Sequence, residues 1–295
     1  MLALRRLWTT LFVVVDDHPI NTSQRFSTTG MEDEQASLLL SLRETLQQQQ
    51  VRLILASQSP RRREILDMML GIRTTPSTTE QQQQQLYDVI VSPLDEEALH
   101  GTLSKSNPAQ YTQTLAEHKA AALVATSFAT TTIPTIVLAS DTIVAHATGG
   151  VLEKPKSPQE ARDMLTLLQN DVHDVHTGVA LQVVLPAAEG QQRPAPQSFV
   201  DTARVQFAAL GAEDIRAYVE TGEPMDKAGA YGIQGMGGQF VESIQGDFFT
   251  VRHFAKKQEV WVLILILSPI LSNPYPCCRS WDYRCIEQAK LWRAR

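Results

Sequence analysis

Helix starts are the feature of this sequence that most restricts how the chain can fold. At Ser59-Pro60, Asn107-Pro108 and Ser157-Pro158, a side chain that can cap a helix directly precedes a proline. Proline suits the first helical position, where its missing N–H costs nothing, and the preceding side chain can accept a hydrogen bond from a free backbone N–H. Glu160 adds a capping box to the third start. We therefore expect helices to begin at or next to these three prolines.

Short apolar runs separate the expected helices. The helices expected are Arg61–Leu70, Pro108–Thr126, Pro158–Leu168 and Ala212–Glu220. The strands expected are Arg52–Ala56, Tyr87–Val91, Ile136–Ala139, Ile143–His146, Thr177–Val184, Ser198–Phe207 and Gln239–Ser243. Strands that alternate with helices along a chain indicate an α/β architecture.

Residues 1–50 are expected to be an extension, with one short helix near Glu32–Leu46. Two arginines and an apolar block open the chain, as in a mitochondrial presequence. Asp16 and Asp17 argue against such a leader. A cytoplasmic and a mitochondrial location therefore both stay open.

Polar, low-complexity stretches divide the rest of the chain. The glutamine run Gln81–Gln85 and the segment Ala187–Gln197 are expected to be solvated loops. We place one domain at 51–251 and an atypical tail at 252–295.

The tail holds the most apolar run, Val260–Leu271, which Ser268 and Pro269 interrupt. It is shorter than the ~20 residues that cross a bilayer, so no membrane span is expected. Such a run should instead cover apolar surface of the domain. Covering the same surface of a second subunit is the alternative, and it would make the protein a homodimer.

Charge excludes some partners. The net charge is -6 with a pI near 5.7, and no basic stripe suggests binding to a nucleic-acid polymer. An acidic chain that binds a polyanion must gather its few cations at one point or use a metal. The 3 cysteines all lie in the tail, which does not fit a disulfide scaffold.

One such gathering of cations follows the first strand. The segment Leu53–Arg63 runs from apolar residues through Ser57 and Ser59 into a helix that begins with Arg61 and Arg62. The free N–H groups of a helix start bind anions, and hydroxyl and guanidinium groups add donors for a phosphate. A capped surface helix with solvated arginines is the alternative.

Three ionisable residues stand in unusual places. Asp141 interrupts the run Ile136–Ala145, and a buried carboxylate is normally paired, metal-bound or functional. An Asp in a turn at a strand end is the simpler explanation. Lys119 lies on the apolar face of the second helix, and Lys154 stands shortly before the third. Each lysine alone is more often a snorkelling side chain than a catalytic one.

A glycine-rich loop and an acidic pair complete the candidates. Six of the 15 glycines fall between Gly222 and Gly238, so a ligand could approach the backbone closely there. Tyr231 or Gln234 in this loop could stack on a base or hydrogen-bond to it. Asp95 and Glu96 follow an expected strand and could hold Mg²⁺, or could simply open an acidic helix.

Together these segments resemble the Maf family of nucleotide pyrophosphatases. The matching segments are Ala56–Arg62, Val91–Glu96, Leu115–Ala120, Ala139–Thr142, Glu153–Pro155, His176–Gly178, Glu223–Gly235 and Gly246–Phe249. The resemblance covers about residues 51–251 in the family's order. It implies a mixed, strongly bent sheet with flanking helices around a nucleotide cleft, related to the inosine-triphosphate pyrophosphatases. After Phe249 the family's usual continuation is replaced by Arg252-His-Phe-Ala-Lys-Lys257.

The resemblance also implies roles for single residues. Asp141 matches the family's general base, and Lys119, Lys154 and the Asp95–Glu96 pair match its other charged positions. Arg61, Thr142 and Gln234 match the positions that set substrate choice, in the form typical of the dTTP/UTP branch. A divalent cation, Mg²⁺ or Mn²⁺, is the implied cofactor.

The expected activity is hydrolysis of a nucleoside triphosphate, dTTP or UTP, to the monophosphate and pyrophosphate by water attack at the α-phosphorus. A non-catalytic nucleotide-binding regulator of cell division is the alternative. Such a regulator would keep Arg61 and Gln234 but would not need Asp141 and both lysines.

Overall fold

The computed structural model describes residue 46 and residues 50–72, 86–128, 131–186 and 195–252. The expected presequence, nearly all of the expected helix near Glu32–Leu46, the glutamine run Gln81–Gln85 and the apolar tail lie outside these residues. Most of the expected loop Ala187–Gln197 also lies outside them.

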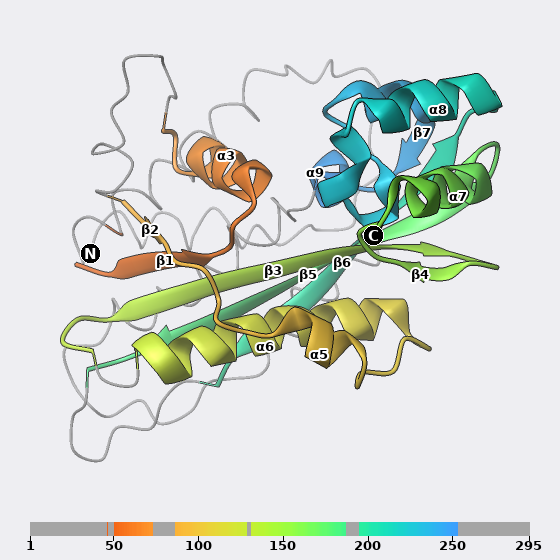
Figure 1. The fold of residues 1–295 in the computed structure, drawn as a ribbon. Coiled ribbons are helices and arrows are strands. Elements are labelled where there is room, and N and C mark those ends of the chain that lie inside the picture. The colour runs from red at the N-terminus through yellow and green to blue at the C-terminus, as the bar shows by residue number, and fades with distance from the viewer. Residues whose placement is uncertain (1–45, 47–49, 73–85, 129–130, 187–194, 253–295) are drawn as a thin grey trace, which may run out of the picture. The chain divides into compact units, whose positions relative to one another are not determined.

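Seven strands in the described ranges form one sheet, in the order β2-β1-β3-β5-β6-β7, with β4 paired to β3 (Figure 1). They are β1 (Arg52–Ala56), β2 (Asp88–Val89), β3 (Thr135–His146), β4 (Gly150–Leu152), β5 (Val172–Val184), β6 (Gln197–Phe207) and β7 (Val241–Gln245). β1 pairs in parallel with β2 and β3, whereas all the other pairs are antiparallel. The sheet is therefore mixed, as expected.

Helices cover both faces of this sheet (Figure 1). They are α3 (Pro60–Met69), α5 (Glu96–His100), α6 (Pro108–Ser127), α7 (Pro158–Leu168), α8 (Ala212–Glu220) and α9 (Phe248–Val251), with 3-10 turns η1 (Glu223–Asp226), η2 (Ala228–Ala230) and η3 (Met236–Phe240). The four helices predicted from the sequence are confirmed to within one residue at each end. In the ranges described, no helix is both long and apolar enough to span a membrane.

The alternation of side chains along β1 explains why both faces are covered. Leu53 and Leu55 pack in the cluster that contains the apolar residues of α3. Ile54 and Ala56 pack in a second cluster, with the apolar residues of α6. Because successive strand residues point to opposite faces, α3 and α6 must lie on opposite sides of the sheet.

The three predicted helix starts are present, but they are not all capped in the same way. Asn107 and Ser157 accept hydrogen bonds from the backbone N–H groups of Gln110 and Glu160. Ser59 stands at the start of α3 but makes no capping bond with its side chain. Instead, the Ser59 N–H donates to the Ser57 hydroxyl, at 3.1 Å. Ser59 therefore occupies the predicted N-cap position, but the predicted capping bond from its side chain is absent.

β3 is the main departure from the expected strands. The sequence predicts two strands separated near Asp141, whereas the structure has one strand of 12 residues. Asp141 and Thr142 do not end the strand, because each has a side-chain partner next to β3. Asp141 pairs with a lysine, and the hydroxyls of Thr142 and Thr177 lie 2.9 Å apart on β3 and β5.

Candidate active site

A break in strand pairing marks the centre of the candidate site. Every residue of β3 has a partner on β5, so β5 occupies one edge of β3. β1 and β4 must therefore both lie along the other edge of β3. On that edge the pairing with β1 ends at Ala139, and the pairing with β4 begins at Val144. Between these positions β3 has no strand neighbour on that edge in the described ranges. Asp141 and Thr142 lie in this break.

Two segments with candidate binding residues leave the sheet at the break. β1 runs parallel to β3, so the residues after Ala56 continue toward the break from one end. β4 runs antiparallel to β3, so the residues after Leu152 approach from the other end. The first segment carries Ser57, and the second carries Lys154. The topology thus brings together segments about 100 residues apart in the sequence.

Asp141 forms a buried ion pair with Lys119 of α6. The Lys119 Nζ lies 2.5 Å from Asp141 Oδ1 and 3.0 Å from Glu96 Oε2 at the start of α5. Asp141 and Lys119 are only 9% and 6% exposed. The pairing explains how the carboxylate is tolerated inside an apolar strand, since a buried charge without a partner would be costly. It also excludes the expectation of an isolated Asp in a surface turn.

The two carboxylates on Lys119 suit a divalent cation. Both have oxygens within 3.0 Å of one nitrogen atom, and oxygen ligands are those that Mg²⁺ prefers. The described ranges contain no group of three or more His, Cys, Asp or Glu side chains that would cage a metal. In the structure these two carboxylates contact the Lys119 ammonium, so a divalent ion held here would need water and substrate oxygens as further ligands. Asp95 is engaged elsewhere, because its carboxylate accepts a hydrogen bond from the Ala98 N–H and caps α5.

The start of α3 offers donors for an anion. The hydroxyl of Ser57 lies 3.4 Å from Arg62 Nη1. The Ser59 hydroxyl is buried and has no hydrogen-bond partner in the part of the chain that the structure describes. A buried hydroxyl of this kind is expected to find a partner, and a phosphate oxygen would serve.

Thr142, Arg61 and Gln234 lie on the other face of the sheet from Asp141. Successive strand residues point to opposite faces, and Asp141 faces α6. Thr142 contacts Thr177, whose hydroxyl donates to the carbonyl of Thr250 in α9. Arg61 Nη1 lies 3.3 Å from Asp226 Oδ2, and Gln234 accepts a hydrogen bond from Arg252. The residues expected to read the base therefore lie on the opposite face of β3 from the Lys119–Asp141 pair.

Glu153 is a residue near the site that the sequence did not single out. Its Oε1 accepts from the Tyr111 hydroxyl at 2.5 Å and lies 3.0 Å from Lys105 Nζ and 3.1 Å from His100 Nδ1. Burial would raise the pKa of Glu153, but these donors outweigh it and hold the pKa at about 2. The Glu153 carbonyl also accepts from the Gly229 N–H, at 3.2 Å. The exposed Lys154 therefore follows a firmly held residue.

Tyr231 does not serve as a stacking platform. Its side chain is 3% exposed and packs edge-on against Phe207, and its hydroxyl lies 2.8 Å from His173 Nε2. The expectation that Tyr231 could stack on a base is wrong, because the ring belongs to the core. Gln234 in the same loop is exposed and stays available.

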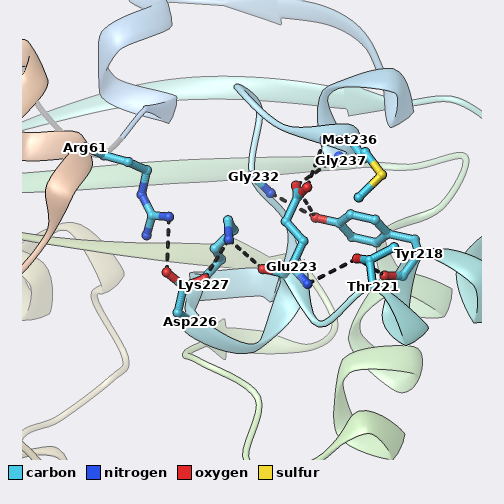
Figure 2. A network of polar contacts seen from close by, with 9 residues as sticks. All are labelled: Arg61, Tyr218, Thr221, Glu223, Asp226, Lys227, Gly232, Met236 and Gly237. Carbon is cyan, nitrogen blue, oxygen red and sulfur yellow. Dashed lines mark hydrogen bonds and ion pairs between the residues drawn. The ribbon is translucent and has the colours of Figure 1, made fainter. Parts of the chain in front are cut away.

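A polar network within the glycine-rich region was also missed (Figure 2). Lys227 is 8% exposed, and its Nζ lies 2.5 Å from the Glu223 carbonyl and 2.6 Å from Asp226 Oδ1. Glu223 in turn accepts from the N–H groups of Met236 and Gly237. The only trace of this network in the sequence is the local order Glu-Pro-Met-Asp-Lys at 223–227. No helical or strand-like spacing of apolar residues accompanies it.

Comparison with known proteins identifies the family. The family model described as Maf-like protein matches residues 52–253. A dTTP/UTP pyrophosphatase of Bacillus velezensis is 40% identical over 200 residues, which are 68% of this chain and 88% of that protein. A dTTP/UTP pyrophosphatase of Alkaliphilus metalliredigens is 41% identical over 202 residues, with the same coverage of 68% and 88%. Among solved structures, the Staphylococcus aureus Ham1 protein is a remote match, with 15% identity and a TM-score of 0.28 over 70% of this chain and 88% of that one. The protein belongs to the Maf-like family.

Proposed function

We propose that this protein hydrolyses nucleoside triphosphates, with dTTP and UTP as its preferred substrates, to the monophosphate and pyrophosphate. The relatives named as dTTP/UTP pyrophosphatases support the substrate class. The observation that carries the proposal is the buried pair of Lys119 and Asp141 at the break in β3, 2.5 Å apart. We assign the activity to the domain at 51–251, and we place the protein in the cytoplasm, with mitochondria as the alternative.

In the proposed reaction, Asp141 acts as the general base. Its Oδ1 is held by Lys119, which leaves Oδ2 to accept a proton from an attacking water. The water oxygen forms a bond to the α-phosphorus as the bond from that phosphorus to the bridging oxygen breaks. Pyrophosphate carries away the electron pair, and the proton leaves Asp141 for solvent. A general base of this kind contributes about 10²–10⁴-fold to the rate.

Cationic and hydroxyl groups at the break would neutralise and position the phosphate chain, which phosphoryl transfer requires above all. Lys154, Ser57, Ser59 and Arg62 are proposed to bind the phosphate oxygens. Glu96, with Asp95 next to it in the chain, would hold a divalent cation, Mg²⁺ or Mn²⁺, when it is bound. Such an ion would supply charge stabilisation to the phosphates.

Arg61, Thr142 and Gln234 are proposed to recognise the pyrimidine. Arg61 offers a guanidinium with an Nε that has no partner in the described ranges, and Gln234 offers an exposed amide. Both groups can hydrogen-bond to the edge of a base. A non-catalytic regulator would need this recognition surface but would not need a buried Lys–Asp pair, so the pair favours an enzyme.

The experiment is a panel of the eight common ribo- and deoxyribonucleoside triphosphates, assayed for pyrophosphate with Mg²⁺ and with Mn²⁺. We expect dTTP and UTP to give the highest kcat/KM and pyrophosphate rather than phosphate as the product. Nucleotide binding without any release of pyrophosphate would favour the regulator. Equal kcat/KM for all eight would contradict the assigned selectivity.

A further inference from the structure

Asp226 bridges two cations that come from distant parts of the chain (Figure 2). Its Oδ2 lies 3.3 Å from Arg61 Nη1, at the start of α3, and its Oδ1 lies 2.6 Å from Lys227 Nζ. The Arg61 side chain is 12% exposed and the Asp226 side chain 63% exposed, so the pair sits at the surface end of the network. Burial would raise the pKa of Asp226, but the bond from Lys227 and the charge of Arg61 lower it, which keeps the carboxylate charged.

Glu223 anchors the other end of this network. Its carboxylate accepts from the backbone N–H groups of Met236 and Gly237, at 3.0 and 3.2 Å, and from the Tyr218 hydroxyl at 3.0 Å. A Cβ at Gly235 would stand 2.3 Å from Glu223 Oε1. The segment directly after Gln234 is therefore held against Glu223, and a larger residue at position 235 would have to displace the Glu223 carboxylate.

Lys227 joins the two ends. Its buried ammonium contacts the Glu223 carbonyl and the Asp226 carboxylate, and a Cβ at Gly232 would stand 2.6 Å from its Cε. One short segment, Glu223–Lys227, thus fixes the place of Arg61 on one side and of the Gln234 loop on the other. Arg61 and Gln234 are two of the residues proposed to read the base.

We propose that Asp226 is a positioning residue that sets base selectivity by holding Arg61 in its place beside the Gln234 loop. This inference rests on the proposed function, because it concerns how the same site chooses its nucleotide. Asp226 does not touch the reacting atoms. It acts on the substrate only through Arg61.

The substitution Asp226→Asn separates the two bonds of this residue. A carboxylate accepts at both oxygens, whereas an amide accepts at one and donates at the other. The bond to Lys227 is shorter, 2.6 Å against 3.3 Å to Arg61, so the amide oxygen should stay with Lys227 and the NH₂ group should face Arg61. Arg61 then loses its anchor while the rest of the network stays in place.

The test is the ratio of kcat/KM for UTP to that for CTP in four proteins: wild type, Asp226→Asn, Arg61→Ala and the double variant. We expect Asp226→Asn to lower this ratio about tenfold, through KM for UTP, with kcat within about twofold of wild type. In the Arg61→Ala background, Asp226→Asn should have no further effect, because residues that act through one contact are not additive. Asp174→Asn is the matched control, since the half-buried Asp174 on β5 also pairs with an arginine, Arg204, at 2.8 Å.

The outcomes separate the inference from the proposed function. A wild type that prefers UTP, together with an Asp226→Asn variant that keeps this preference, would overturn the inference alone. A further loss of selectivity on adding Asp226→Asn to Arg61→Ala would also overturn it. A wild type that releases no pyrophosphate from either nucleotide would overturn the proposed function, and the inference with it. If Asp226→Asn lowers the melting temperature sharply, a second variant is needed. Arg61→Lys keeps the charge but loses the planar fork, and it must reproduce the loss of selectivity for the inference to stand.

Discussion

Asp141 on β3 lies directly opposite Gly178 on β5, and Gly178 lies against the backbone of α6. A Cβ at Gly178 would stand 2.5 Å from the carbonyl oxygen of Thr112. The missing side chain thus lets α6 approach the sheet, and α6 is the helix that carries Lys119 to Asp141. The close approach of helix and sheet and the buried ion pair depend on each other.

The substitution Gly178→Ala should push α6 away from the sheet. We expect a loss of about 1–3 kcal/mol in the free energy of unfolding, typical of overpacking, and a drop in kcat as Lys119 moves from Asp141. Urea unfolding and pyrophosphate release measure the two effects. Gly101→Ala is the control, because its nearest contact would be an ordinary 3.6 Å. Wild-type stability and activity in Gly178→Ala would show that α6 does not need this close approach.

Removing the cation of the buried pair should destabilise the fold. Lys119→Met leaves the Asp141 carboxylate buried beside Glu96 with no cation, and we expect a loss of about 3 kcal/mol, in the range for breaking a buried ion pair. Adding Asp141→Asn should restore at least about 1 kcal/mol, since the uncompensated charge is then gone. Chemical unfolding of the two variants measures this coupling, with the exposed Lys156→Met as control. A double variant less stable than Lys119→Met would contradict the account of the pair.

His173 should make the protein sensitive to mild acid. Burial, together with the charge of nearby His146, lowers the pKa of His173 to about 4 from its ordinary 6.5. The unfolded chain therefore takes up this proton first as the pH falls, so stability is complete above pH 6.5 and is lost toward pH 4. The loss should be about 1–3 kcal/mol.

Unfolding curves from pH 7.5 to 4 measure this effect. His173→Gln should flatten the dependence, because glutamine does not titrate in this range. His118→Gln should not, since His118 is exposed on α6. An unchanged slope in His173→Gln would assign the acid sensitivity to other groups.

The sequence predicted those parts of the fold that local chemistry determines. The caps at Asn107 and Ser157 and the apolar spacing after them give the correct bounds of α6 and α7. The α/β class followed from the alternation of elements, and the mixed sheet followed from the family resemblance. The expected nucleotide cleft, and the roles of the expected site residues, stay predictions.

The misses arise where a residue's partner is far away in the sequence. The continuity of β3 through Asp141 depends on Lys119, 22 residues earlier, and the bond from Arg61 to Asp226 spans 165 residues. Tyr231 looked available for a base because its neighbours are glycines, yet Phe207 and His173 enclose it. Single-sequence patterns carry no information on such pairings.

Pyrophosphate release from UTP by the Asp141→Asn variant tests the central claim most directly. The amide can still accept a hydrogen bond from Lys119, so the fold should be kept, whereas the proton acceptor is lost. We predict a fall in kcat of about 10²–10⁴-fold with a nearly unchanged melting temperature, while the control Asp174→Asn, at a half-buried ion pair, keeps wild-type turnover. An Asp141→Asn variant that retains more than about a tenth of the wild-type kcat would contradict the assignment of Asp141 as the general base.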